Sequence, residues 1–288
     1  MTKQGRNKNA ANDAAADGGA IDETSKKLQN ALKALSLDGS QNKHELAETF
    51  CLSGSDALLQ GELEDAFDCF SRAARLDPKL VAAHVGLGKT YLAVEDYDAA
   101  FKEADAAVSL NQKSAEAFEL RGHARRFHED FEKAIQDYTR AIELDRRSCL
   151  SYYGRAIAYD MTGEVVKALD DFEKCVGIDP EFVPAYYDRG VVYANERRYE
   201  EAIVDYTKAL ELDPAFVHCY VARGEAYIER GLPNHAIEDF NAALQYDPEN
   251  PDAYYYRAQA WKMLGRGPAA RRDMKTARDL GFDEDVDA

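Results

Sequence analysis

The sequence repeats with a constant period of 34 residues, and this feature constrains the fold more than any other. An aspartate or asparagine marks each period and four times precedes a proline, at Asp77, Asn111, Asp145, Asp179, Asp213 and Asp247. The units align without a gap. A fixed period of this length indicates one supersecondary unit stacked many times, because a single unit cannot bury its own apolar face.

Small and large residues alternate in a fixed pattern within each unit. The eighth position holds Gly54, Gly88, Gly122, Ala156, Gly190, Gly224 and Ala258. The twentieth position is always alanine, and the twenty-seventh is alanine except at Cys175, which we interpret as a small buried residue. Aromatic residues recur at the eleventh and twenty-fourth positions. Because small residues let helices approach closely and large ones fill the remaining volume, the pattern predicts two packed helices per unit.

Helix ends are also marked in the sequence. Four units carry glycine at the fifteenth position, at Gly61, Gly163, Gly231 and Gly265. Glycine adopts a left-handed turn without steric cost, so we expect the first helix to end there. The aspartate and proline pairs are expected to end the second helix and to open the next one, where the missing N–H of proline costs little.

Arginine and acidic residues vary together between units. The seventh position is arginine in units three to seven, and the twenty-third position is acidic in units two to seven. The interior unit that lacks arginine has Leu87, which would face Cys69 if each arginine paired with the acid of the preceding unit. We therefore expect a ladder of ion pairs between repeats, such as Arg189 with Asp171, that fixes their register.

These residues, together with proline at position thirty-two, resemble the tetratricopeptide repeat (TPR) family. The resemblance implies an all-α fold, a right-handed superhelical solenoid of antiparallel helix pairs, with an inner groove lined by the first helix of each pair. It departs from the family pattern at Ala104 and Arg125, where aromatic residues are usual. The predicted units are 47–80, 81–114, 115–148, 149–182, 183–216, 217–250 and 251–284.

The segments outside the repeats have a different composition. Residues 1–23 contain almost no large apolar side chains, which predicts a disordered tail. Within 24–46, Leu28, Leu32 and Leu35 recur at helical spacing and predict an amphipathic helix and linker. This helix either caps the first repeat or lies in the groove. Residues 285–288 are expected to form an acidic tail.

Composition narrows the classes of partner. The formal net charge of -17 argues against nucleic acid, because phosphate binding needs clustered Lys and Arg. Five cysteines lie far apart without C-x-x-C spacing, so we expect neither a disulfide framework nor a zinc site, and a reducing compartment. No apolar stretch approaches the roughly 18 residues of a membrane span, and no secretory signal is present. The cytoplasm is predicted, with the nucleus as an open alternative.

The family resemblance also indicates where a partner would bind. Positions two, five, nine, twelve and thirteen face the groove in this family, and in the middle units they are apolar: Tyr153, Ile157, Met161, Tyr187, Val191, Val221 and Ile228. We expect them to hold a peptide or helix segment of another protein, with inward packing as the alternative. Lys89, His123 and Arg126 form a weaker cationic candidate, opposed by Glu116 and Glu119.

A non-catalytic scaffold or adaptor is the function that this pattern predicts. The clamp by which family members hold the acidic C-termini of Hsp70 and Hsp90 needs Lys and Asn, whereas the matching positions here include Cys51, Ser55 and Gly86. That departure argues against a co-chaperone. No nucleophile with a base, metal ligand set, cofactor motif or phosphate loop is recognisable. A structural subunit of a larger assembly remains the other alternative.

Overall fold

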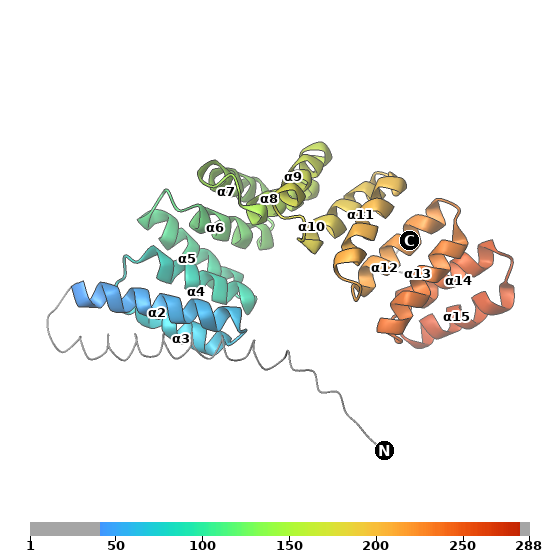
Figure 1. Ribbon diagram of the computed structural model, residues 1–288, viewed down its shortest axis with the longest axis horizontal. Coiled ribbons are helices and arrows are strands. Elements are labelled where there is room, and N and C mark those ends of the chain that lie inside the picture. The colour runs from blue at the N-terminus through green and yellow to red at the C-terminus, as the bar shows by residue number, and fades with distance from the viewer. Residues whose placement is uncertain (1–40, 283–288) are drawn as a thin grey trace, which may run out of the picture. The chain divides into compact units, whose positions relative to one another are not determined.

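The computed structural model describes residues 41–282, and over this range the chain is all-α and built from consecutive antiparallel helix pairs (Figure 1). The helices are α2 (Gln41–Leu59), α3 (Leu63–Leu76), α4 (Val81–Ala93), α5 (Tyr97–Leu110), α6 (Ala115–Phe127), α7 (Phe131–Leu144), α8 (Cys149–Met161), α9 (Val165–Ile178), α10 (Val183–Asn195), α11 (Tyr199–Leu212), α12 (Val217–Glu229), α13 (Pro233–Tyr246), α14 (Pro251–Met263) and α15 (Gly267–Asp279).

Each 34-residue period corresponds to one helix pair. From α4 to α14, every first helix begins at the residue predicted to open its unit, such as Val81 and Pro251. The exception is α2, which begins at Gln41, before Ala47, in a stretch expected to be linker. The tail predicted at 1–23, the helix predicted from residue 24 and the acidic tail at 285–288 lie outside the described residues.

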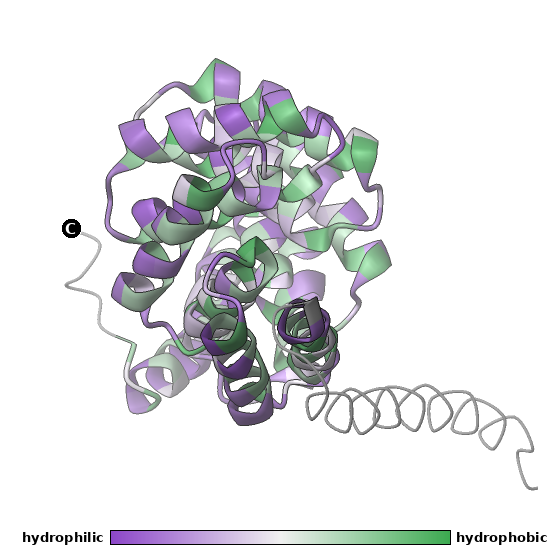
Figure 2. Cartoon of the chain, turned by 90° about the vertical axis from the view of Figure 1, so that its left-hand side faces the viewer, coloured by the Kyte–Doolittle hydropathy of each residue, from purple (hydrophilic) through white to green (hydrophobic). Residues whose placement is uncertain are grey.

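The helices belong to two compact units, which divide between Arg146 and Arg147. The first unit contains α2 to α7 and the second contains α8 to α15. Hydrophobic and hydrophilic positions alternate along the helices (Figure 2), and in each unit the buried apolar residues form clusters between neighbouring helices. This arrangement is the expected one for helices that bury an apolar stripe against their neighbours.

The helix pairs are held at close range by a small residue facing an aromatic ring. A Cβ atom built on Gly190 would lie 2.7 Å from the ring of Tyr206, and one on Gly224 would lie 2.5 Å from Phe240. Both rings are almost fully buried. Burying such a ring stabilises the fold by roughly 1.5–3 kcal/mol. The close packing of two helices that the small and large residues predict is therefore present, and it places the eighth position against the twenty-fourth.

The second repeat shows how one departure from the pattern is accommodated. Its twenty-fourth position is Ala104, which leaves Gly88 without a ring from its own repeat. Leu120 of the next repeat occupies this space, with its Cδ2 atom 2.4 Å from a Cβ built on Gly88. The volume lost in one repeat is thus filled by its neighbour.

A left-handed residue follows the first helix in every repeat. The glycines predicted to do so, such as Gly61 at φ 76° and Gly231 at φ 70°, do adopt this conformation. The other repeats place Glu95, Glu129 and Arg197 there, at φ 58° to 60°. The turn is therefore a property of the whole array, and three units adopt it with a residue for which it is sterically unfavourable.

Relieving this strain should stabilise the protein. The side chain of Glu129 is exposed and takes no part in the core. Glu129→Gly removes the steric cost of the left-handed conformation but increases the conformational entropy of the unfolded chain. The difference between these two effects is expected to raise the free energy of unfolding by about 0.5–1 kcal/mol. Gly231→Ala is the matched reverse change and should lower stability by a similar amount. The midpoint of urea unfolding measures both. A lower midpoint for Glu129→Gly would contradict this reading of the turn.

The arginines of the seventh position pair within their own repeat, so the predicted ladder between repeats is wrong. Arg189 donates from Nε and Nη2 to the two carboxylate oxygens of Asp205, both at 2.7 Å, and does not use Asp171. The same bidentate contact recurs in Arg121–Asp137, Arg155–Asp171, Arg223–Asp239 and Arg257–Asp273. Positions seven and twenty-three lie opposite each other in the antiparallel pair, which explains the choice.

The second repeat has a substitute for its missing arginine. In the second repeat Leu87 leaves Glu103 without the usual partner, and His84 contacts this carboxylate through Nδ1 at 2.7 Å. The hydrogen bond to Glu103 raises the pKa of His84. A basic side chain one helical turn away therefore replaces the arginine. A comparison of positions seven and twenty-three alone does not detect this replacement.

The arginines still link successive repeats, through a different position. The Nη1 atom of Arg223 donates to Thr207 Oγ1 at 3.0 Å, and that of Arg257 donates to Asn241 Oδ1 at 2.6 Å. In both cases the acceptor is the twenty-fifth residue of the preceding repeat. Burial raises the pKa of the Asp239 carboxyl, and the guanidinium of Arg223 opposes this shift. Arg223 and Arg257 thus bridge their own helix pair and the one before it.

Double-mutant cycles distinguish the two pairings. Arg189→Leu leaves a buried carboxylate unpaired and should cost about 3 kcal/mol. Its effect should couple with that of Asp205→Leu by roughly 1–3 kcal/mol and add to that of Asp171→Leu, whose partner is Arg155. Urea unfolding of the single and double variants gives both coupling energies. If Arg189 coupled only with Asp171, the ion pairs would link successive repeats, and the pairing within repeats would be wrong.

The cysteines also differ from the prediction. Cys149 and Cys175 are joined by a disulfide within the α8–α9 pair. Cys175 is buried at the place of the usual alanine, as predicted, but it is not only a small packing residue. The first and twenty-seventh positions of a repeat lie opposite each other, so a sequence separation of 26 becomes a direct contact. Cysteine usage consequently no longer supports a reducing compartment.

Candidate functional site

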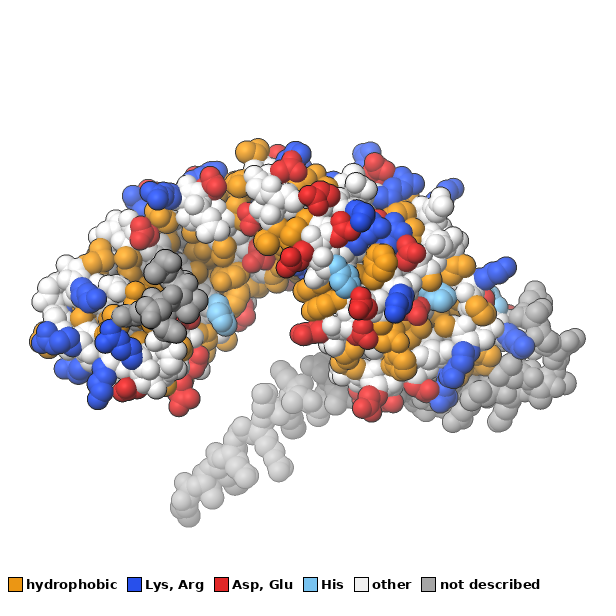
Figure 3. All heavy atoms as spheres, turned by 180° about the vertical axis from the view of Figure 1, so that it is seen from behind, with side chains coloured by type: hydrophobic (Ala, Val, Ile, Leu, Met, Phe, Trp, Pro, Cys, Tyr) orange, Lys and Arg blue, Asp and Glu red, His pale blue; other side chains and the backbone are white. Residues whose placement is uncertain are grey.

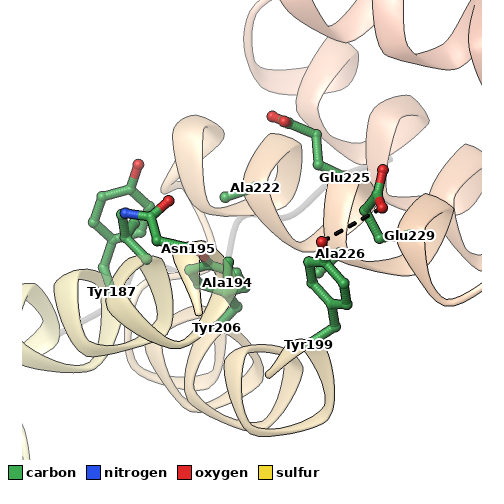
Figure 4. Close-up of a pocket in the computed structure, with 10 residues that line it drawn as sticks. Tyr187, Ala194, Asn195, Tyr199, Tyr206, Ala222, Glu225, Ala226 and Glu229 are labelled. Atoms are coloured by element: carbon green, nitrogen blue, oxygen red, sulfur yellow. Dashed lines mark hydrogen bonds between the residues drawn. The ribbon is translucent and has the colours of Figure 1, made fainter. Parts of the chain in front are cut away.

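The second unit contains a groove built from the first helices of its last three repeats. Its larger pocket, of about 400 Å³, lies mainly between α10 and α12 (Figure 4). Glu225 and Glu229 of α12 stand on one side, and Tyr187 and Asn195 of α10 stand on the other. The pocket is lined by Tyr187, Val191, Ala194, Asn195, Tyr199, Tyr206, Ala222, Glu225, Ala226 and Glu229.

A second pocket of about 240 Å³ adjoins the first, between α12 and α14. Tyr187, Ala222 and Glu225 line both pockets, so the two form one surface, which we call the α10–α14 groove. The second pocket is lined by Tyr187, His218, Val221, Ala222, Glu225, Asn250, Asp252 and Tyr256. In the space-filling view, hydrophobic side chains are exposed beside acidic ones on the helical surface (Figure 3).

Three of the seven predicted groove residues line these pockets. They are Tyr187, which lines both, Val191 and Val221. The ring of Tyr187 lies 4.8 Å from that of Phe216 and 5.9 Å from that of Tyr206, centroid to centroid. Tyr187 is therefore held in place by its neighbours while one side of it borders the groove.

The other four predicted groove residues lie elsewhere. Tyr153 and Ile157 pack against the core of the α8–α9 pair, and the Tyr153 hydroxyl donates to Asp188 Oδ2 at 2.6 Å. Met161 is 60% exposed at the end of α8. Ile228 packs in a cluster with Trp261 and Leu264. For Tyr153, Ile157 and Ile228 the structure favours inward packing, the alternative raised from the sequence.

The acidic side of the groove was missed by sequence reasoning. Glu225 occupies the ninth position of its repeat, Asn195 and Glu229 the thirteenth, and Asp252 the second. These are the same positions that selected the apolar residues. The groove positions therefore indicated these residues too, but the prediction included only apolar side chains. Tyr199 lies on a second helix, α11, and its hydroxyl contacts Glu229 Oε2 at 3.4 Å.

Neighbouring carboxylates add to the effect of burial on two titratable groups of this unit. Burial raises the pKa of the Tyr187 hydroxyl, and the charges of Asp188 and Glu225 raise it further. Burial likewise raises the pKa of Asp160, and the charge of Glu196 adds to the shift. Both effects disfavour additional negative charge, which is the behaviour expected on a surface of negative potential.

A third pocket, of about 340 Å³, lies in the first unit where the family clamp would be. Cys51, Ser55, Gly86 and Glu116 line it, together with Lys89. Lys89, one of the weaker cationic candidates, pairs with Glu116 Oε1. The lysine is thus engaged by a carboxylate of the same pocket and is poorly placed to hold an acidic tail.

The other two cationic candidates do not act as cations of this pocket. Burial, together with the charge of Arg126, lowers the pKa of His123 to about 4, so the imidazole is neutral at pH 7. Its ring packs edge-on against Tyr138 at 5.5 Å. The Arg126 guanidinium lies 4.4 Å from the centre of the Phe127 ring. Neither residue is among those that line the pocket.

Among the described residues there is neither a cluster of metal ligands nor a helix suited to span a membrane. Within residues 41–282, no group of three or more His, Cys, Asp and Glu side chains is arranged to hold a metal ion. None of the helices there combines the length and apolar composition that crossing a membrane requires.

Family models decide the classification. Models described as tetratricopeptide repeat match residues 51–117, 119–181 and 183–216, and one described as TPR repeat matches 224–265. The chain belongs to the tetratricopeptide repeat family. The predicted fold class is confirmed: this TPR protein is an α-solenoid of antiparallel helix pairs.

Solved TPR structures share this fold at low sequence identity. The TPR protein YrrB is 23% identical with a TM-score of 0.56, over 63% of this chain and 93% of its own. A TPR protein from Parabacteroides merdae is 20% identical with a TM-score of 0.58, over 83% and 95%. In the Cut9-Hcn1 hetero-tetramer of APC/C, the matched chain is 16% identical with a TM-score of 0.69, over 83% of this chain but 46% of its own.

Proposed function

We propose that this TPR protein is a non-catalytic scaffold or adaptor that binds a peptide or helix segment of a partner protein in the α10–α14 groove. The observation that carries the proposal is the pair of adjoining pockets that share Tyr187, Ala222 and Glu225. Shallow grooves of this kind, with a fixed aromatic ring and nearby carboxylates, suit a side chain of a partner better than a buried substrate.

The aromatic side chains give the groove its anchoring capacity. Tyr187, Tyr206 and Tyr256 line it, and the first two pack against each other at 5.9 Å. Tyrosines held by their neighbours lose little conformational entropy on binding, so an apolar partner side chain gains contact at low cost. The solved structure of YrrB is described as having an unusual peptide-binding site, which supports this mode of binding for a relative with the same fold.

Other roles have weaker support. A co-chaperone that holds acidic C-termini would need cations in the first unit, where Lys89 is paired with Glu116. A structural subunit of a larger assembly is compatible with the Cut9-Hcn1 likeness, which is a likeness of fold. A cytoplasmic location, and the absence of a nucleic-acid partner, remain predictions from composition.

Filling the groove tests the proposal without removing a packed ring. Ala222 lines both pockets and is half-buried, so Ala222→Gln adds a neutral side chain where the partner would lie. We expect this variant to lose at least about tenfold in affinity for its partners, which corresponds to roughly 1.4 kcal/mol. Quantitative mass spectrometry of proteins co-purified with the wild type and the variant measures the loss.

The matched control is Ala242→Gln on α13, another half-buried alanine that lines neither pocket. Both variants should melt within a few degrees of the wild type. Retention of every specific partner by Ala222→Gln, or equal losses in both variants, would contradict binding in the groove.

A further inference from the structure

The arginines on the first helices of the second unit do not supply free positive charge to the groove. Each of α8, α10, α12 and α14 carries one arginine, and each is bound in a bidentate manner by an aspartate of the following helix. The side chains of Arg155, Arg189 and Arg223 are only 15% to 16% exposed. Their charges are therefore matched inside the helix pairs.

The remaining charged side chains of these four helices are mostly acidic. The carboxylates are Asp160, Asp188, Glu225, Glu229 and Asp252. Opposed to them stands Lys262, which is exposed and contacts Gln259 at 3.5 Å. Among the described residues that line the two pockets, there are three carboxylates and no lysine or arginine. Among these lining residues, His218 is the single basic side chain.

Acidic and apolar side chains are interleaved in the groove. Glu225 lies on the wall that both pockets share, next to Ala222 and opposite Tyr187. Glu229 and Asp252 stand at the two sides of this shared wall, one in each pocket. A ligand that places an apolar side chain against Tyr187 necessarily brings its neighbouring residues close to carboxylates.

We propose, on the basis of the function proposed above, that the occupant of the α10–α14 groove is a cationic segment of a partner protein, with Lys or Arg residues flanking an apolar anchor. The anchor packs against Tyr187 and Val191 in the larger pocket. The flanking cations face Glu225 and either Glu229 or Asp252. Charge complementarity of this kind raises the association rate and excludes acidic segments, which would meet like charge at each of these positions.

Three synthetic peptide libraries test this inference on the full chain. All contain 12-residue fluorescent peptides with Leu, Ile, Phe or Tyr at fixed anchor positions. The other positions are Lys or Arg in the cationic library, Ser or Gln in the neutral library, and Asp or Glu in the acidic library. Fluorescence anisotropy at about 0.15 M salt measures the affinities. We expect the cationic library to bind about tenfold or more tightly than the neutral one, and the acidic library to bind weakest.

Two double variants with equal change in charge locate the effect. Glu225→Gln with Glu229→Gln removes carboxylates from the groove and should weaken the cationic peptides about fivefold, leaving the neutral ones within about twofold. Asp170→Asn with Glu238→Gln removes two exposed carboxylates from α9 and α13 and should change neither. If both double variants weakened the cationic peptides equally, the preference for cationic peptides would come from the net charge of -17 and not from the groove. That result would overturn the inference.

The outcomes separate this inference from the proposed function. If Ala222→Gln abolishes the binding of all three libraries but their affinities are equal, the groove binds peptides and the inference about charge is wrong. If the acidic library binds best, the inference is also wrong. If no library binds in a manner sensitive to Ala222→Gln, the proposed function itself fails.

Discussion

The close contact between a small residue and an aromatic ring determines how most of the helix pairs are built, with Ala104 and Met274 as the exceptions at the ring position. With Gly224 at the eighth position, the backbone of α12 approaches the ring of Phe240 on α13, where a Cβ atom would clash. This contact fixes the spacing and rotation of the two helices. The same face of every first helix is consequently buried, and the same other face is left to line a groove. The dependence of the groove on one repeated contact explains why the small residues recur so regularly.

The paired arginines connect the packed helices and also determine which charges remain in the groove. Arg223 joins its own helix pair through Asp239 and reaches back to Thr207 of the preceding repeat. A buried pair of this kind adds little net stability, but it specifies which groups lie opposite each other. It also withdraws the arginines from the surface. The carboxylates that remain on the first helices of the second unit, with Tyr187 between them, then set the character of the groove.

Much of the fold could be predicted because it depends on local, repeated signals. The period predicted where the first helix of each repeat from α4 to α14 begins, and glycine predicted the turns at Gly61 and Gly231. The sequence could not decide whether each arginine pairs with the acid of its own repeat or with the acid of the preceding repeat. In a periodic sequence both acids recur at a constant distance from the arginine. The His84 contact to Glu103 concealed the difference. The disulfide was not predicted because only the helix pair brings Cys149 and Cys175 together. The acidic wall was not predicted because the groove positions were considered for apolar side chains only, although Glu225 and Glu229 occupy two of them.

Site-specific photocrosslinking tests most directly that partners bind in the α10–α14 groove. Asn195 is exposed at the end of α10 and lines the larger pocket, so a benzoylphenylalanine there would face a bound segment. The account predicts covalent adducts with partner protein from position 195, and none from the same residue placed at Asp170 on α9. Adducts from position 170 alone, or equally from both positions, would contradict it.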